Sequence, residues 1–256
     1  MNRRYRIAME AKMKYAVLIG MFSITGLWAG PINTYSAVTV DAKTGYAMLY
    51  AYYPLVTGCF NERGTMVSDS GGAQWAPFNP SLWLGYAPLR RLELTFALPY
   101  YSDFDTSNGF GDPVVQVKYQ FMTAPFSAAL HVWLSLPVGA ENLTSGSYEL
   151  TVGALATKQL GKVTAYANLY DTFSFPNEGP LISYNGAAEY DFNSVIGGFV
   201  ELNGIHSAGE DQLGLLPGIA FTIGKSFSID AGLSIPVWGR NCPAGLTPCG
   251  FIGYNF

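Results

Sequence analysis

Apolar and polar residues alternate with a period of two over most of the chain. In "VVQVKYQF" (114 to 121) the odd positions are apolar or aromatic, whereas the even positions after Val114 are Gln116, Lys118 and Gln120. Successive side chains of a β-strand point to opposite faces, so this pattern predicts strands with one apolar and one polar face. The predicted strands are 45–56, 81–88, 91–100, 113–122, 126–136, 147–158, 162–171, 181–190, 194–205, 212–223, 226–236 and 249–256.

Short and long connections alternate between these strands. The tight turns are "LRR", "TAP", "LGK", "DFN" and "GKS", and the longer loops are 57–80, 101–112, 137–146, 172–180, 206–211 and 237–248. Outer-membrane barrels have an even number of antiparallel strands, short turns at the periplasmic end and long loops outside. We therefore predict an all-β fold over residues 45–256, a 12-stranded antiparallel transmembrane β-barrel of the outer-membrane type.

The low charge of the chain supports a lipid environment. Charged residues make up 12% of the sequence, about half the share in an average soluble protein. A soluble β-sandwich or β-barrel also has alternating strands, but it needs charge on its exterior. The 14 basic and 18 acidic residues form no basic patch for nucleic acid. We expect outer-membrane lipid as a partner, no nucleic acid, and a location in the bacterial outer membrane.

Aromatic residues gather beside the predicted short turns and at the last residue. Six of these aromatic residues occupy positions on the apolar face of their predicted strands: Phe121, Phe126, Tyr190, Phe221, Phe227 and Phe256. Aromatic girdles lie at the interfaces of membrane barrels. The last strand must pair with the first, because unpaired main-chain groups in hydrocarbon each cost several kcal/mol. Ile252, Tyr254 and Phe256 also resemble the carboxy-terminal signal read by the barrel-assembly machinery.

The first thirty residues differ from the rest. Basic residues precede the apolar run "YAVLIGMFSITGLW" (15 to 28), which small residues follow. This layout predicts a cleavable signal peptide at residues 1–29, with an uncleaved anchor as the alternative. Residues 30–44 then precede the barrel, either as a plug inside the lumen or as a loose periplasmic leader, and the sequence leaves both open.

Residues on the polar face of the predicted strands are expected to line the lumen of the barrel. They are Glu93, Gln116, Lys118, Gln120, His131, Glu149, Asn168, Glu189, Glu201 and Asp230. An aqueous path lined by this excess of acids would favour cations or uncharged solutes. The alternative is a packed lumen in which Lys118 pairs with carboxylates and nothing passes, because twelve strands lie between filled and open barrels.

Candidate chemistry is sparse. Cys242 and Cys249 flank a predicted loop and could form a disulfide, with Cys59 left over. No His or Cys cluster has the spacing of metal ligands, and we expect no metal and no cofactor. His206 beside Ser207 suggests an outer-membrane lipid hydrolase, but sequence adjacency is weak support for a catalytic pair. We therefore expect no enzyme and no catalytic residues.

The stretch "GFGDPVVQVKY" (109 to 119) resembles a signature of transporter-like outer-membrane proteins named after the meta-pathway of phenol degradation. The likeness covers residues 80 to 256, including "LPVG" (136 to 139) and "LLPGIAFTIGKSFSIDAGLSIP" (215 to 236). It implies a barrel for passive uptake of small, hydrophobic or aromatic solutes, with Gly109, Gly111 and Asp112 as a structural turn at the extracellular rim. The competing interpretation is a non-conducting structural or adhesive barrel.

Overall fold

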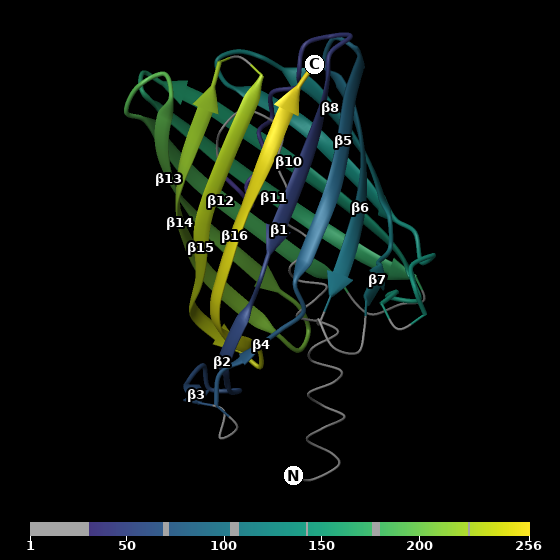
Figure 1. The fold of residues 1–256 in the computed structure, drawn as a ribbon, viewed down its shortest axis with the longest axis vertical. Coiled ribbons are helices and arrows are strands. Elements are labelled where there is room, and N and C mark those ends of the chain that lie inside the picture. Colours follow the sequence, from purple (N-terminus) through teal and green to yellow (C-terminus); the bar gives the residue numbers. More distant parts are fainter. Residues whose placement is uncertain (1–30, 69–71, 103–107, 142, 176–179, 225) are drawn as a thin grey trace.

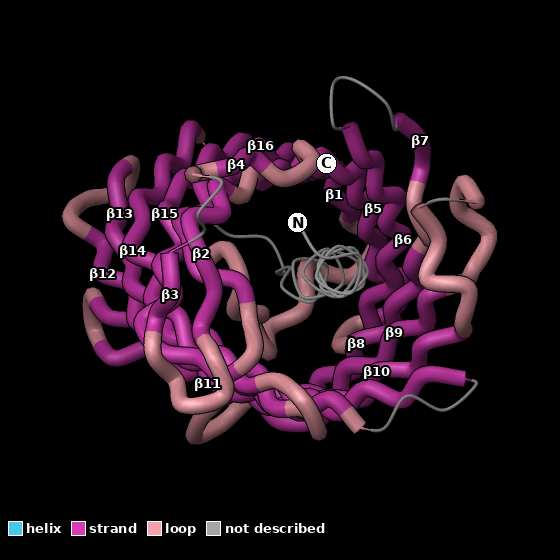
Figure 2. Tube along the Cα trace, turned by 90° about the horizontal axis from the view of Figure 1, so that it is seen from below, coloured by secondary structure: helices cyan, strands magenta, loops and turns pink. Residues whose placement is uncertain are grey.

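The computed structural model describes residues 31–256 except 69–71, 103–107, 142, 176–179 and 225. Sixteen strands form one antiparallel sheet, and twelve of them close into a ring because the last strand pairs with the first (Figures 1 and 2). The predicted 12-stranded antiparallel barrel is confirmed. The part of the chain that the structure describes contains no helix with the length and apolar character needed to cross a membrane. The predicted signal peptide, residues 1–29, lies outside the described residues.

Each predicted strand corresponds to one strand of the ring. In chain order they are β1 (Gly45–Tyr52), β5 (Asn79–Leu89), β6 (Leu92–Ser102), β8 (Val114–Met122), β9 (Ser127–Ser135), β10 (Tyr148–Leu160), β11 (Val163–Phe175), β12 (Leu181–Asp191), β13 (Ile196–His206), β14 (Asp211–Ile223), β15 (Phe227–Arg240) and β16 (Pro243–Asn255). Every ring strand pairs with its two neighbours along the chain, apart from the β1–β16 closure.

Four short strands lie outside the ring. They are β2 (Leu55–Phe60), β3 (Met66–Ser68), β4 (Gln74–Trp75) and β7 (Asn108–Phe110). The first three extend the wall at the long-loop end, where β2 pairs with β16, and β7 pairs with β6 (Figure 1). The single strand predicted over 45–56 is divided here, since β1 ends at Tyr52 and Pro54, which has no N–H to donate, precedes β2.

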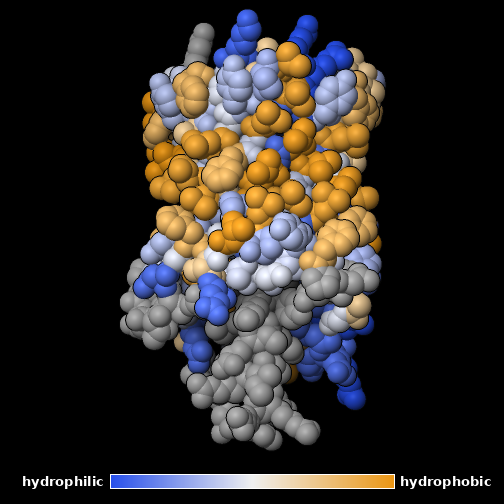
Figure 3. Space-filling model, turned by 90° about the vertical axis from the view of Figure 1, so that its right-hand side faces the viewer, coloured by the Kyte–Doolittle hydropathy of each residue, from blue (hydrophilic) through white to orange (hydrophobic). Residues whose placement is uncertain are grey.

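The apolar side chains of the barrel face outward and the polar ones face inward, the reverse of the arrangement in a soluble protein. Leu94 and Val117 are 42% and 39% exposed, whereas their strand neighbours Glu93 and Lys118 are only 3% and 2% exposed. On the face seen in Figure 3, apolar side chains predominate across the middle of the molecule, and hydrophilic residues lie toward both ends. Phe121, next to a short turn, is also exposed. The outer surface thus offers hydrocarbon-compatible groups to lipid, as the alternation predicts.

The carboxy-terminal residue closes the ring. The Gly45 N–H donates to the Phe256 carbonyl at 2.8 Å, and the Phe256 N–H donates to the Gly45 carbonyl at 2.9 Å. Seven residue pairs connect β1 and β16 in register from Tyr46 to Tyr52. Phe256 therefore helps to close the ring at the short-turn end, where β1 begins and β16 ends.

The predicted disulfide between Cys242 and Cys249 is wrong, because both thiols are free. The segment expected as a loop, 237–248, belongs largely to β15 and β16, which extend beyond the membrane belt. Cys242 directly precedes β16 and Cys249 lies within it. Seven residues of extended strand span about 23 Å, whereas a disulfide needs Cα atoms within about 7 Å.

Candidate functional site: the lumen and the segment inside it

Residues 31–40 lie inside the barrel, and exposed residues 41–43 connect them to β1. Ile32, Tyr35, Ala37 and Val40 are all buried, and the segment forms no helix or strand. Figure 2, a view along the barrel, shows loop backbone crossing the interior of the ring. The segment reaches the short-turn end at Lys43, whose N–H donates to the Ala87 carbonyl at 2.7 Å. The lumen in this structure is therefore occupied by the chain's own amino-terminal segment.

Glu201 holds the beginning of the segment. This carboxylate projects from β13 and is completely buried. It accepts hydrogen bonds from the Ile32 N–H, from the Asn33 N–H at 2.9 Å and from the Thr34 hydroxyl at 2.9 Å. A buried carboxylate requires such donors because its transfer from water is otherwise costly. One glutamate thus fixes three consecutive residues near the middle of the barrel.

Amide and hydroxyl side chains hold the next residues. The Asn168 side chain accepts from the Tyr35 N–H at 2.7 Å and donates to the Tyr35 carbonyl at 2.9 Å. Asn185 donates to the Asn33 carbonyl at 3.3 Å, and the Ala37 N–H donates to the Thr157 hydroxyl at 2.8 Å. These wall residues belong to three neighbouring strands, β12, β11 and β10. The segment therefore crosses the inner face of these strands as it runs toward the short-turn end.

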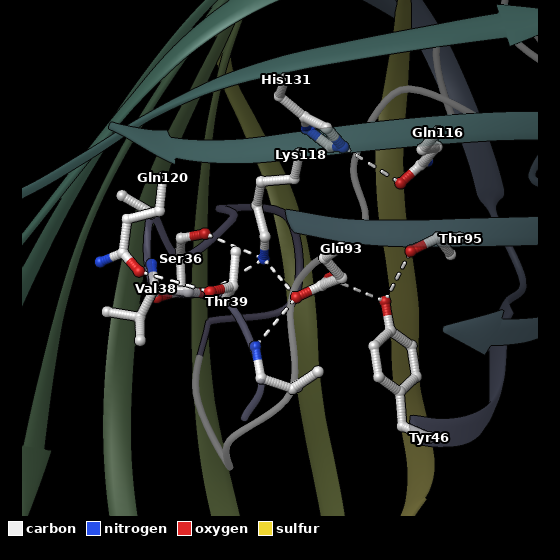
Figure 4. Close-up of polar contacts among 12 residues, drawn as sticks. Ser36, Val38, Thr39, Tyr46, Glu93, Thr95, Gln116, Lys118, Gln120 and His131 are labelled. Atoms are coloured by element: carbon white, nitrogen blue, oxygen red, sulfur yellow. Dashed lines mark hydrogen bonds and ion pairs between the residues drawn. The ribbon is translucent and has the colours of Figure 1, made fainter. Parts of the chain in front are cut away.

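A buried ion pair holds the last part of the segment (Figure 4). Lys118 Nζ lies 3.1 Å from Glu93 Oε2, and both side chains are almost fully buried. The same ammonium donates to the Val38 carbonyl at 3.1 Å and to the Ser36 carbonyl at 3.4 Å. Glu93 in turn accepts from the Val40 N–H at 3.1 Å. The pair therefore offers a cation to carbonyl groups and an anion to an N–H group of the segment.

An aromatic cluster surrounds the Tyr35 ring. Its centroid lies 4.8 Å from that of His131 and 5.6 Å from that of Trp133, and both arrangements are edge-on. Trp133 stacks on Tyr170 with a centroid separation of 5.3 Å. His131 also contacts Gln116 through Nε2 at 3.2 Å. Such ring pairs stabilise beyond the area they bury, by about 0.5–1.5 kcal/mol each.

The sequence-predicted lumen residues all lie on the inner side of the wall, and all ten are buried. Six of them form the contacts described above, and Gln120 accepts from the Thr39 hydroxyl at 3.3 Å. Glu149 and Asp230 are buried at lumen-facing positions of β10 and β15. Glu189 accepts from the Tyr166 hydroxyl at 2.7 Å and lines a pocket of about 440 Å³ at the short-turn end, with Lys162.

The Gly-x-Gly-Asp turn forms a separate structural cluster at the long-loop rim. Asp112 is buried and accepts from the Gly139 N–H at 2.9 Å and from the Ser145 N–H at 2.7 Å. A Cβ added at Gly111 would lie 2.3 Å from the Tyr101 ring, so only glycine fits there. The turn therefore joins two extracellular loops, and Asp112 does not reach the lumen lysine, which pairs with Glu93.

The rim histidine contacts a carboxylate, as in a hydrolase triad, but the neighbouring serine hydroxyl donates to a main-chain carbonyl. His206 Nδ1 contacts the Asp211 carboxylate, which also pairs with Arg240 at 2.8 Å. The Ser207 hydroxyl donates to the Glu210 carbonyl at 3.2 Å. Within the described residues no group of three or more His, Cys, Asp or Glu is arranged to hold a metal ion.

Sequence reasoning gave the segment as a lumen plug in one of two alternatives, but it named none of the contacting residues of the segment. It also missed four of their wall partners, Thr157, Asn185, Trp133 and Tyr170. Thr157 and Asn185 have lumen parity and are buried, so the alternation could have identified them. Tyr35 gave no signal, because its role depends on rings from strands that lie about a hundred residues away.

Comparisons with known proteins agree with this architecture. A family model described as "Putative MetA-pathway of phenol degradation" matches residues 33–247. The COG4313 outer membrane channel from Pseudomonas putida F1 is similar in structure, with 15% identity, a TM-score of 0.72, and coverage of 86% of this chain and 98% of that chain. The KdgM porin, solved in complex with disordered oligogalacturonate, has 10% identity, a TM-score of 0.58, and coverage of 82% and 99%. A comparison with curated proteins finds no match.

Proposed function

The chain belongs to the family described as "Putative MetA-pathway of phenol degradation", and from this membership and the lumen geometry we propose a passive uptake channel of the outer membrane for small solutes. The observation that carries the proposal is the combination of an apolar outer belt with a polar interior that a non-covalently held segment enters. A wall of this kind can span lipid, and its interior can pass solutes once the segment moves.

The lining favours apolar or aromatic solutes over sugars. Trp133, His131 and Tyr170 already hold one phenol ring, that of Tyr35, inside the lumen. Two further aromatic residues on the lumen side, Tyr50 and Trp83, are buried as well. Rings of this kind stack on flat apolar solutes and keep a polar tip in contact with water. The acids of the lumen support passage of uncharged or cationic molecules rather than anions.

The segment supplies the closed state of the proposed channel. Its contacts with the wall are hydrogen bonds and ring contacts, each worth about 0.5–1.5 kcal/mol net when neutral and more when one partner is charged. Their sum keeps the segment inside for most of the time, and its release would open the path. We propose that residues 31–44 act as this plug, that no step of the function is enzymatic, and that the carboxy-terminal residues Ile252, Tyr254 and Phe256 direct barrel assembly.

Conductance in planar bilayers tests the proposal. We expect rare, small openings for the unmodified chain and frequent openings for a full-length chain carrying Tyr35→Pro and Ala37→Pro, because both lose an N–H donor to the wall. Vesicles containing the variant should admit a cationic aromatic amine faster than a pentose of similar size. If neither chain conducts, the barrel is a structural or adhesive one.

A further inference from the structure

The lumen wall contacts the enclosed segment mainly through its main chain. Five backbone N–H groups donate to wall side chains, those of Ile32, Asn33, Tyr35, Ala37 and Val40. Four backbone carbonyls accept from wall side chains, those of Asn33, Tyr35, Ser36 and Val38. Only two side chains of the segment, Thr34 and Thr39, hydrogen-bond to the wall in the described structure.

The wall matches the polarity of each main-chain group. Carboxylates of Glu201 and Glu93 face N–H groups, and the ammonium of Lys118 faces two carbonyls. Asn168 both accepts from and donates to Tyr35, which is the pattern by which one β-strand residue binds its neighbour. A wall built only to fill space would not need this match, because apolar side chains of similar volume would fill it at lower cost.

Besides Thr34 and Thr39, one position of the segment contacts the wall through an aromatic side chain. The Tyr35 ring lies among His131, Trp133 and Tyr170. Its neighbours Ser36 and Ala37 contribute main-chain groups to the wall. The wall therefore binds the segment through main-chain hydrogen bonds, which do not depend on the sequence of the segment, and through one aromatic pocket that holds Tyr35. Sheet edges bind extended peptides in a similar way.

We propose that the lumen contains a binding site for an extended peptide, about nine residues long, with an aromatic side chain at the position of Tyr35. The chain's own residues 32–40 occupy this site in the structure, and an external oligopeptide takes their place when they leave. The site selects secondary amides, because N-alkylated or ester linkages lack the donors that Glu201, Asn168, Thr157 and Glu93 require. This inference concerns binding, so it does not depend on whether the lumen conducts.

Peptide binding to a full-length chain with a loosened segment tests the proposal. The chain carries Tyr35→Pro and Ala37→Pro, which weaken the segment and leave every wall side chain unchanged. The probe is a synthetic peptide with the native sequence of residues 31–43, labelled with fluorescein at its carboxy-terminal lysine. Binding is followed by fluorescence anisotropy in detergent micelles. We expect saturable binding that is at least ~10-fold tighter than to the unsubstituted chain, whose own segment competes.

Two further peptides separate main-chain from side-chain recognition. A peptide N-methylated at the positions of Tyr35 and Ala37 should bind at least ~10-fold more weakly, because two buried acceptors lose their donors. A peptide with alanine at the positions of Ser36 and Val38 should bind within ~3-fold of the native sequence. Equal binding of the methylated peptide, or loss of binding by the alanine peptide, would overturn the proposal.

The variant should fold, because the substitutions lie outside all strands of the ring. Its mobility on an unboiled gel checks this. Should the double variant not fold, the single Ala37→Pro chain serves with the same three peptides. A folded, loosened chain that shows no saturable binding of the native peptide also overturns the proposal, whatever its conductance.

Discussion

Replacing Lys118 with methionine tests how the lumen network holds the segment. The ammonium lies 3.1 Å from Glu93 and 3.1 Å from the Val38 carbonyl, in a site from which water is almost excluded. Methionine has a similar length but no charge and no donor. The substitution therefore leaves the Glu93 carboxylate without its cation and two segment carbonyls without their donor.

The size of the effect follows from these losses. Removing one partner of a buried ion pair costs about 3–5 kcal/mol, because the remaining charge is uncompensated. Two carbonyls that lose a donor add roughly 1 kcal/mol. Glu93 keeps its bonds from Val40 and from the Tyr46 hydroxyl, which reduce the cost. We expect a net loss of about 4 kcal/mol in the free energy of unfolding, roughly a thousand-fold in the folding equilibrium.

The double variant Lys118→Met, Glu93→Gln is the matched control. It removes both charges and keeps an acceptor for the Val40 N–H, so it should regain at least about 2 kcal/mol relative to the single variant. Guanidinium unfolding of the refolded barrel in lipid vesicles, followed by tryptophan fluorescence, measures all three chains. A loss below about 1 kcal/mol for Lys118→Met, or a double variant no more stable than the single one, would refute the reasoning.

Three further predictions address other parts of the molecule. An impermeant maleimide should label exposed Cys59 at least ~100-fold faster than Cys242, because burial raises the pKa of the Cys242 thiol to about 12 and leaves little thiolate at neutral pH; comparable rates, measured by mass spectrometry, would contradict the burial. Asp112→Ala should lower the free energy of unfolding by about 2–3 kcal/mol and speed protease cleavage near Ser145, since two N–H groups lose a charged acceptor; unchanged cleavage would argue against this link. Deleting Phe256 should reduce the yield of heat-modifiable barrel on gels, because two hydrogen bonds at the closing seam are lost, and a normal yield would show that the seam does not need them.

The strands and their faces could be predicted because the lipid belt imposes a local rule. Each residue such as Val117 or Gln116 faces either hydrocarbon or lumen, and the choice is visible in two neighbouring letters of the sequence. Beyond the belt this constraint ends, and there the prediction failed: β2, β3 and β4 were not foreseen, and the strands around Cys242 were interpreted as a loop.

The placement of the segment could not be predicted, because its partners are distant in sequence. Asn33 meets Glu201 across 168 positions, and Tyr35 meets Asn168 across 133. The residues of the segment are small and polar enough to suit either solvent or lumen. Only the closed ring, which brings seven strands (β6 and β8 to β13) around the segment, decides between them.

The most direct test of the inverted barrel is a nitroxide scan along β8, from Val114 to Met122. Labels at odd positions such as Val117 should be accessible to oxygen dissolved in lipid and protected from a water-soluble nickel complex. Labels at even positions, such as Gln116, should be shielded from lipid-dissolved oxygen. The account predicts this alternation with a period of two in electron paramagnetic resonance relaxation. Lipid accessibility at the even positions, with Val117 protected from it, would contradict the inversion.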